Sequence, residues 1–104
     1  MLNKYEDAIK VYSKALQINE KSPECHFNLA SAYNDMSNYS NAVFHYKRAI
    51  ELDPKNIDAY ICLGGVLENV RDPQEAEKVY LIAKQVEPSN PRIKEALSNL
   101  RRKW

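Results

Sequence analysis

Apolar residues recur along the chain at the spacing of helices that each bury one face. Within residues 39–52, Ala42, Tyr46, Ala49 and Ile50 follow i, i+4, i+7 and i+8 spacing, which places them on one side of a helix. The five prolines all stand between such stretches, where helices start or stop. The pattern predicts an all-α chain of about six helices, at residues 2–18, 23–36, 39–52, 57–70, 73–86 and 91–102.

Three of the predicted helices begin with the same pair, a residue with a side-chain oxygen followed by a proline. Ser22, Asp72 and Asn90 each precede a proline. A side-chain oxygen at that place accepts a hydrogen bond from a free N–H of the first helical turn, and proline suits the first helical position. These three residues are therefore expected to cap the helices that follow them.

The chain matches itself when it is shifted by 34 residues. Tyr12 then meets Tyr46 and Tyr80, and the small residues recur in the same phase: Ala8 with Ala42 and Ala76, and Ala15 with Ala49 and Ala83. Alanines let neighbouring helices approach closely, and tyrosines fill the wider gaps. A fixed stride of this length indicates stacked repeat units.

A 34-residue helix–turn–helix unit whose Ala- and Tyr-containing second helix ends at Asp-Pro resembles the tetratricopeptide repeat. The best match is residues 23–56, through Leu29, Ala30, Tyr33, Tyr39, Ala42, Tyr46, Ala49 and Pro54. The resemblance implies an antiparallel helix-hairpin solenoid, the tetratricopeptide superhelix, in one domain of residues 1–104. Its expected parts are a half repeat (1–22, second helix only), two full repeats (23–56 and 57–90) and a capping helix (91–104). The second full repeat departs from the pattern at Leu67, where a tyrosine is usual, and at Pro73, where the preceding unit has Tyr39.

The resemblance also implies a protein-interaction scaffold, in which the first helices of the units line a concave groove for a peptide or partner helix. Carried onto this chain, the groove residues are Glu24, Phe27, Asn28, Ser31, Asn34, Asp35, Asp58, Ile61, Gly65, Glu68 and Asn69, with Arg92, Glu95 and Asn99 added by the last helix. The groove positions in the first helices of the two full repeats (residues 23–36 and 57–70) hold four acids and no base, so a basic or amide-rich segment would be favoured. The alternative is that these positions are merely solvated.

Two groove positions bear on the kind of peptide. Asn28 stands where several members of the family use an asparagine to bind a peptide backbone, and an amide both donates and accepts. Members that bind chaperone tails ending in EEVD grip the terminal carboxylate with a lysine and an arginine. The matching places here hold Asp58 and Cys62, so we expect no binding of such tails.

The N-terminal half repeat lacks the helix that would precede it. Ala8, Tyr12 and Ala15 would normally press against that helix, and a repeat cannot bury its apolar face alone. We therefore expect an N-terminal docking face at these residues. A longer solenoid, another subunit of a larger complex or a homodimer would cover it, and a bare, frayed helix is the alternative.

The last helix combines an apolar stripe with a basic end. Ile93, Ala96, Leu97 and Leu100 share one face, and the rest of the helix is polar. This pattern indicates a helix that closes the last repeat. The alternative is a basic contact site that ends in Trp104.

Composition removes several function classes. The formal net charge is +1, which argues against a nucleic-acid binder. No apolar stretch is long enough for membrane insertion, and the first residues do not form a signal peptide. The two cysteines have no metal-site spacing. We expect an intracellular, cytoplasmic protein without a metal or cofactor.

No residue set indicates catalysis, so we expect no enzyme. Cys25 and His26 are adjacent on a helix and therefore point about 100° apart. His26 takes the place of a core aromatic, His45 is expected on the outer face of its helix, and Gly64 is explained by close helix packing.

Overall fold

The computed structural model describes residues 4–19 and 21–104, and within these ranges the chain forms six α-helices and no strand. The helices are α1 (Lys4–Ile18), α2 (Pro23–Asp35), α3 (Tyr39–Leu52), α4 (Ile57–Asn69), α5 (Pro73–Val86) and α6 (Pro91–Lys103). The predicted all-α fold is confirmed, and the described helix ends lie within one residue of the predicted ones. The first two residues of the helix predicted at 2–18 lie outside the described ranges.

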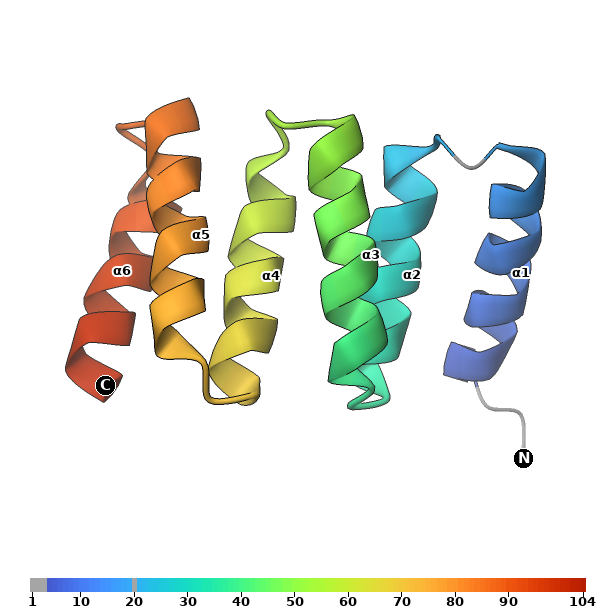
Figure 1. Ribbon diagram of the computed structural model, residues 1–104, viewed down its shortest axis with the longest axis horizontal. Helices are drawn as coiled ribbons and strands as arrows, with labels where there is room; N and C mark the ends of the chain where they lie inside the picture. The colour runs from blue at the N-terminus through green and yellow to red at the C-terminus, as the bar shows by residue number, and fades with distance from the viewer. Residues whose placement is uncertain (1–3, 20) are drawn as a thin grey trace.

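The helices stand side by side in chain order, and each packs against the next (Figure 1). The molecule measures 39 × 28 × 19 Å along its principal axes, and α1 and α6 occupy opposite ends of the long axis. This arrangement is the expected solenoid of antiparallel helix hairpins.

The predicted N-caps are confirmed. Ser22 Oγ accepts a hydrogen bond from the N–H of Cys25 at 3.3 Å, and Asp72 Oδ1 accepts one from Glu75 at 3.2 Å. Asn90 Oδ1 accepts from the N–H of Arg92 at 2.9 Å. These bonds satisfy amide groups that the first helical turn leaves without an intrahelical partner.

The hairpin turns after α2 and α4 share one geometry. Ser37 and Arg71, 34 positions apart, are the positive-φ residues of the described chain, at 61° and 62°. The N–H of Asn38 reaches the carbonyl of Tyr33 at 2.8 Å, and the N–H of Ser37 reaches that of Asn34 at 2.9 Å. This pair of bonds is a Schellman motif, which usually has glycine at the left-handed position. Here both turns place an L-residue there.

The repeat positions fill the core. Ala42, Ala49, Ala76 and Ala83 are fully buried, and Tyr46 and Tyr80 are each 2% exposed. Residues 34 apart therefore occupy equivalent surroundings in the two full hairpins. The last helix adds Ile93, Leu97 and Leu100 to the same core.

Gly64 shows why one of these positions must be small. A Cβ atom at Gly64 would overlap the ring of Tyr80, whereas one at Gly65 would meet nothing within 4 Å. The explanation of Gly64 by close helix packing is therefore correct, and the tyrosine of α5 is the side chain that requires it.

Candidate functional site

The expected groove residues lie along α2 and α4 with graded exposure. On α2, Phe27, Ser31 and Asn34 are half-buried, and Glu24, Asn28 and Asp35 are exposed. On α4 the half-buried residues are Ile61, Gly65 and Glu68, and the exposed ones are Asp58 and Asn69. Each half-buried residue of α2 has its counterpart 34 positions later on α4, so the two sets form neighbouring rows.

Part of this set meets in one concavity of about 390 Å³. Asn34 of α2 and Gly65, Glu68 and Asn69 of α4 line it, together with Cys62, Val66 and Lys103. The other expected groove residues do not line it, and Phe27 instead packs edge-on against Tyr46 with ring centroids 5.5 Å apart. The sequence reasoning missed Lys103, although its 34-residue register with Asn69 was the signal that could have found it.

One residue that lines the concavity has a hydrogen-bond acceptor without a partner. Asn34 Oδ1 is buried and makes no hydrogen bond to any described part of the protein. A buried polar atom without a hydrogen bond costs stability, on the order of 1–3 kcal/mol. The atom is buried, so a donor that enters the concavity would reach it only if the Asn34 side chain rotated.

Two of the four expected acids already have partners. Arg92 Nη1 of α6 donates to Asp58 Oδ1 at 2.5 Å, and the Tyr80 hydroxyl donates to Glu68 Oε2 at 2.6 Å. Burial, followed by the Glu68 carboxylate, raises the pKa of Tyr80. Glu24 and Asp35 remain as the exposed acids of α2, without an ion pair to another described residue.

The thiol beside this concavity is not activated. Burial is the main cause that raises the pKa of Cys62, and the nearby Asp58 carboxylate acts in the same direction. A raised pKa keeps the thiol protonated, and the thiolate is the nucleophilic form. Cys62 therefore acts here as a small, weakly polar lining residue.

The expected outward position of His45 is wrong. Its Nδ1 atom lies 3.1 Å from Nδ1 of the buried His26, and its ring stacks on Tyr33 at 5.7 Å. Burial, with a smaller contribution from His26, lowers the pKa of His45 to about 4. The misplacement arose because helical spacing alone does not show how far the Tyr33 and His26 rings of α2 reach over α3.

The expected N-terminal docking face on α1 is less buried than the equivalent face of α3. Helix α1 has no buried residue among those described, and Ala8, Tyr12 and Ala15 are partly exposed. In α3 the equivalent residues, Ala42, Tyr46 and Ala49, are at most 2% exposed. Helix α1 contacts α2 on one side, and no described helix lies on its other side (Figure 1).

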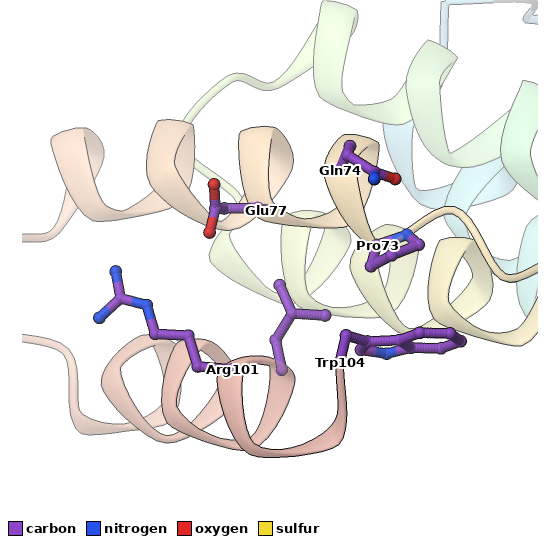
Figure 2. A pocket seen from close by; sticks show the side chains of 6 residues that line it. Pro73, Gln74, Glu77, Arg101 and Trp104 are labelled. Atoms are coloured by element: carbon purple, nitrogen blue, oxygen red, sulfur yellow. The ribbon is translucent and has the colours of Figure 1, made fainter.

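A second pocket lies at the other end of the molecule, between the start of α5 and the end of α6. Figure 2 shows Arg101 of α6 and Trp104, the residue after that helix, facing Pro73 and Glu77 of α5. The pocket has a volume of about 310 Å³. The Trp104 side chain is half exposed, and Lys103 Nζ lies 5.8 Å from its ring centroid. Leu100, which also lines this pocket, is buried, so the end of α6 is both packed and basic.

The described residues contain no group of three or more His, Cys, Asp or Glu side chains placed to hold a metal ion. In the same part of the chain, no helix combines the length and apolar character that crossing a membrane requires.

Three models of one family match the chain. A model described as TPR repeat matches residues 2–37, and two described as tetratricopeptide repeat match residues 23–56 and 45–78. No curated protein sequence matches the chain.

Solved structures give the same fold. The Arabidopsis OM64 TPR domain is 26% identical with a TM-score of 0.86, and the match covers 97% of this chain and 84% of that one. The first TPR of Spaghetti (RPAP3), bound to the HSP90 peptide SRMEEVD, is 26% identical with a TM-score of 0.85, covering 95% and 79%. The second TPR domain of human RPAP3, in complex with the HSP70 peptide SGPTIEEVD, is also 26% identical with a TM-score of 0.85, covering 94% and 82%.

Proposed function

Because the chain belongs to the tetratricopeptide repeat family, a family of protein-interaction modules, we propose that it binds an extended peptide or a partner helix along α2, α4 and α6. The observation that carries this proposal is the concavity that spans these three helices and is lined by Asn34, whose buried Oδ1 has no hydrogen-bond partner among the described residues. After rotation of the Asn34 side chain, a backbone N–H of a bound segment would satisfy that atom.

The exposed acids of α2, which lie outside the concavity itself, favour a basic or amide-rich segment along that helix. Glu24 and Asp35 are exposed there, and the Asp58 carboxylate of α4 is already paired with Arg92. Exposed ion pairs contribute little each, roughly 0.2–1 kcal/mol, so they select among partners rather than supply most of the affinity.

The two RPAP3 domains were solved with EEVD peptides, but this chain is expected to reject them. An arginine and a lysine grip that terminal carboxylate in members of the family, whereas Asp58 and Cys62 stand at those places. Neither Asp58, which is already paired with Arg92, nor Cys62 supplies the free cation that such a carboxylate needs.

Fluorescence anisotropy with three labelled peptides tests the proposal: an amidated peptide of alternating Asn and Lys, its Asn and Glu counterpart, and SRMEEVD. The Lys peptide should bind best, and reversal of both acids (Glu24→Lys with Asp35→Lys) should weaken it about three- to tenfold. Glu77→Lys with Glu87→Lys makes the same charge change at two exposed residues away from α2 and should have no effect. Preference for SRMEEVD would contradict the proposed partner chemistry.

A second variant tests the role of Asn34. Asn34→Ala removes a buried acceptor without a partner, so the free energy of unfolding should stay level or rise while peptide affinity falls. Loss of stability together with unchanged affinity would show that the residue serves the fold instead.

A second candidate function is docking through the N-terminal face into a larger assembly or a homodimer. The partial exposure of Ala8, Tyr12 and Ala15 favours it, since their equivalents in α3 are buried. Tyr12→Glu should abolish association measured by analytical ultracentrifugation and leave peptide binding intact, with Lys10→Glu as the control on the same helix. A well-folded monomer at high concentration would count against the homodimer.

A further inference from the structure

A small apolar pocket lies on the side of α4 that faces away from the concavity. Tyr60 and Leu63 form its floor, Ile50 of α3 forms one wall, and Val79 and Ile82 of α5 form the other. Successive residues of a helix are about 100° apart, which puts the mean direction of Tyr60 and Leu63 about 140° from that of Gly65 and Glu68. The pocket, of about 250 Å³, is thus separate from the site proposed above.

The repeat itself does not require this pocket to be apolar. Ile82 is 47% exposed, and the residue 34 positions earlier, at the same place on α3, is Arg48. The next equivalent, on α1, is Lys14. Beside Ile82, Leu81 is 39% exposed and corresponds to Lys47 and Ser13. Helix α5 therefore exposes apolar side chains where the two other equivalent helices carry basic or hydroxyl groups.

The rim of the pocket is charged, and its charges are unequally engaged. Glu51 accepts from Arg48 at 2.6 Å, and Glu75 has Lys78 at 3.9 Å. The third rim residue, Lys47, is exposed and forms no ion pair with another described residue. The rim thus presents one exposed cation without an ion pair to another described residue, next to an apolar floor.

We propose that this pocket is a second protein-binding site, which takes an apolar side chain of a partner protein together with an adjacent carboxylate that pairs with Lys47. Exposed apolar patches bordered by polar residues commonly mark interaction sites. The anchor side chain would cover Ile82 and Leu63, and the carboxylate would fix its orientation. The chain would then hold two partners at once, one on each side of α4.

N-acetyl-leucine is a suitable probe because it carries an isobutyl group and a free carboxylate. Titration followed by amide NMR should shift signals of Leu63, Val79 and Ile82, with a dissociation constant in the millimolar range expected of so small a ligand. N-acetyl-leucinamide, which lacks the charge, should bind about two- to fivefold more weakly. Lys47→Gln should remove that difference.

Ile82→Arg introduces the residue that α3 carries at the same place, so the fold should tolerate it, as circular dichroism would confirm. It should weaken both probes at least about tenfold, the effect of roughly 1.4 kcal/mol of lost apolar contact. The matched control is Val11→Arg, at an apolar residue of α1 that is 64% exposed, and it should leave binding unchanged.

Three results would overturn the proposal. One is the absence of localised shifts up to the solubility limit of the probe. Another is shifts that gather at Asn34 and Asn69, which would assign the probe to the concavity. The third is a dimer in sedimentation that Ile82→Arg dissolves, because the occupant would then be a second copy of this chain.

Discussion

Gly64 and Gly65 are neighbours on α4 with opposite surroundings. The Tyr80 ring lies where a side chain at Gly64 would go, and its hydroxyl is held by Glu68. The space beside Gly65 is open. A Gly→Ala substitution at Gly65 therefore tests the gain in helix propensity alone, whereas the same substitution at Gly64 adds the cost of overpacking.

Gly64→Ala should lower the free energy of unfolding by about 1–3 kcal/mol, because overpacking outweighs the gain in helix propensity. Gly65→Ala should raise it by about 0.5–1 kcal/mol, because only the propensity changes. Urea denaturation of both variants measures the difference. Equal effects of the two substitutions would rule out the contact with Tyr80 as the cause.

His45 makes stability depend on pH. Its pKa falls from an ordinary value of 6.5 to about 4 in the folded chain, so the unfolded state binds more protons between these values. Stability is therefore full above about pH 6.5 and decreases as the pH falls towards 4. Because His45 is only partly buried, we expect a loss of roughly 1–2 kcal/mol rather than the full linkage value.

Urea denaturation at pH 7 and pH 5 measures this loss. Val79 occupies the equivalent place on α5, so His45→Val is the matched variant, and it should show a smaller decrease between the two pH values. An unchanged pH dependence in that variant would assign the effect to other groups.

Among the elements, the hairpin turns carry an identifiable strain. Ser37 and Arg71 adopt left-handed backbone angles, which cost an L-residue roughly 1–2 kcal/mol and cost glycine nothing. The two Schellman turns impose this conformation because their hydrogen bonds require it. Neither turn contains the glycine that would relieve it.

Arg71→Gly should therefore stabilise the protein by about 0.5–1 kcal/mol, the remainder being lost to the greater freedom of glycine in the unfolded chain. Thermal unfolding by calorimetry measures the change. Lys55→Gly, in a connection whose φ angles are not positive, is the control and should not stabilise. A destabilised Arg71→Gly variant would contradict this account of the turns.

The helices could be predicted from sequence because their signals are local. Cap residues, prolines and the apolar spacing all lie within a few positions of the boundary that they set, as at Ser22 and Asp72. The pairing of Asp58 with Arg92 and the place of Lys103 in the concavity could not be predicted in the same way. They depend on how the end of one helix reaches over another, which the repeat spacing does not specify.

At the scale of the whole molecule, the two outermost helices of the described row are unequally packed. Helix α6 buries Ile93, Leu97 and Leu100, whereas α1 has no buried residue in its described part. Stability in such a row is the sum of each unit's own stability and the interfaces between neighbours. Helix α1 has the fewest buried groups to hold it.

Amide hydrogen exchange should reveal the lower local stability of α1. Amides in the middle of α1 should show at least about tenfold less protection than those of α4, since regions with few buried contacts open locally. Exchange followed by NMR at neutral pH resolves individual amides. Equal protection of both helices would indicate that α1 is covered in solution, and sedimentation would then identify a dimer.

The placement of α1 and α6 at opposite ends of one row has a mechanical consequence. A pull applied between those helices loads the interfaces in series, so the molecule should yield helix by helix, beginning with α1, rather than in a single rupture. A peptide bound across α2, α4 and α6 would hold together the interfaces between α2 and α6. The force needed to extend the chain would therefore be higher when the peptide is bound.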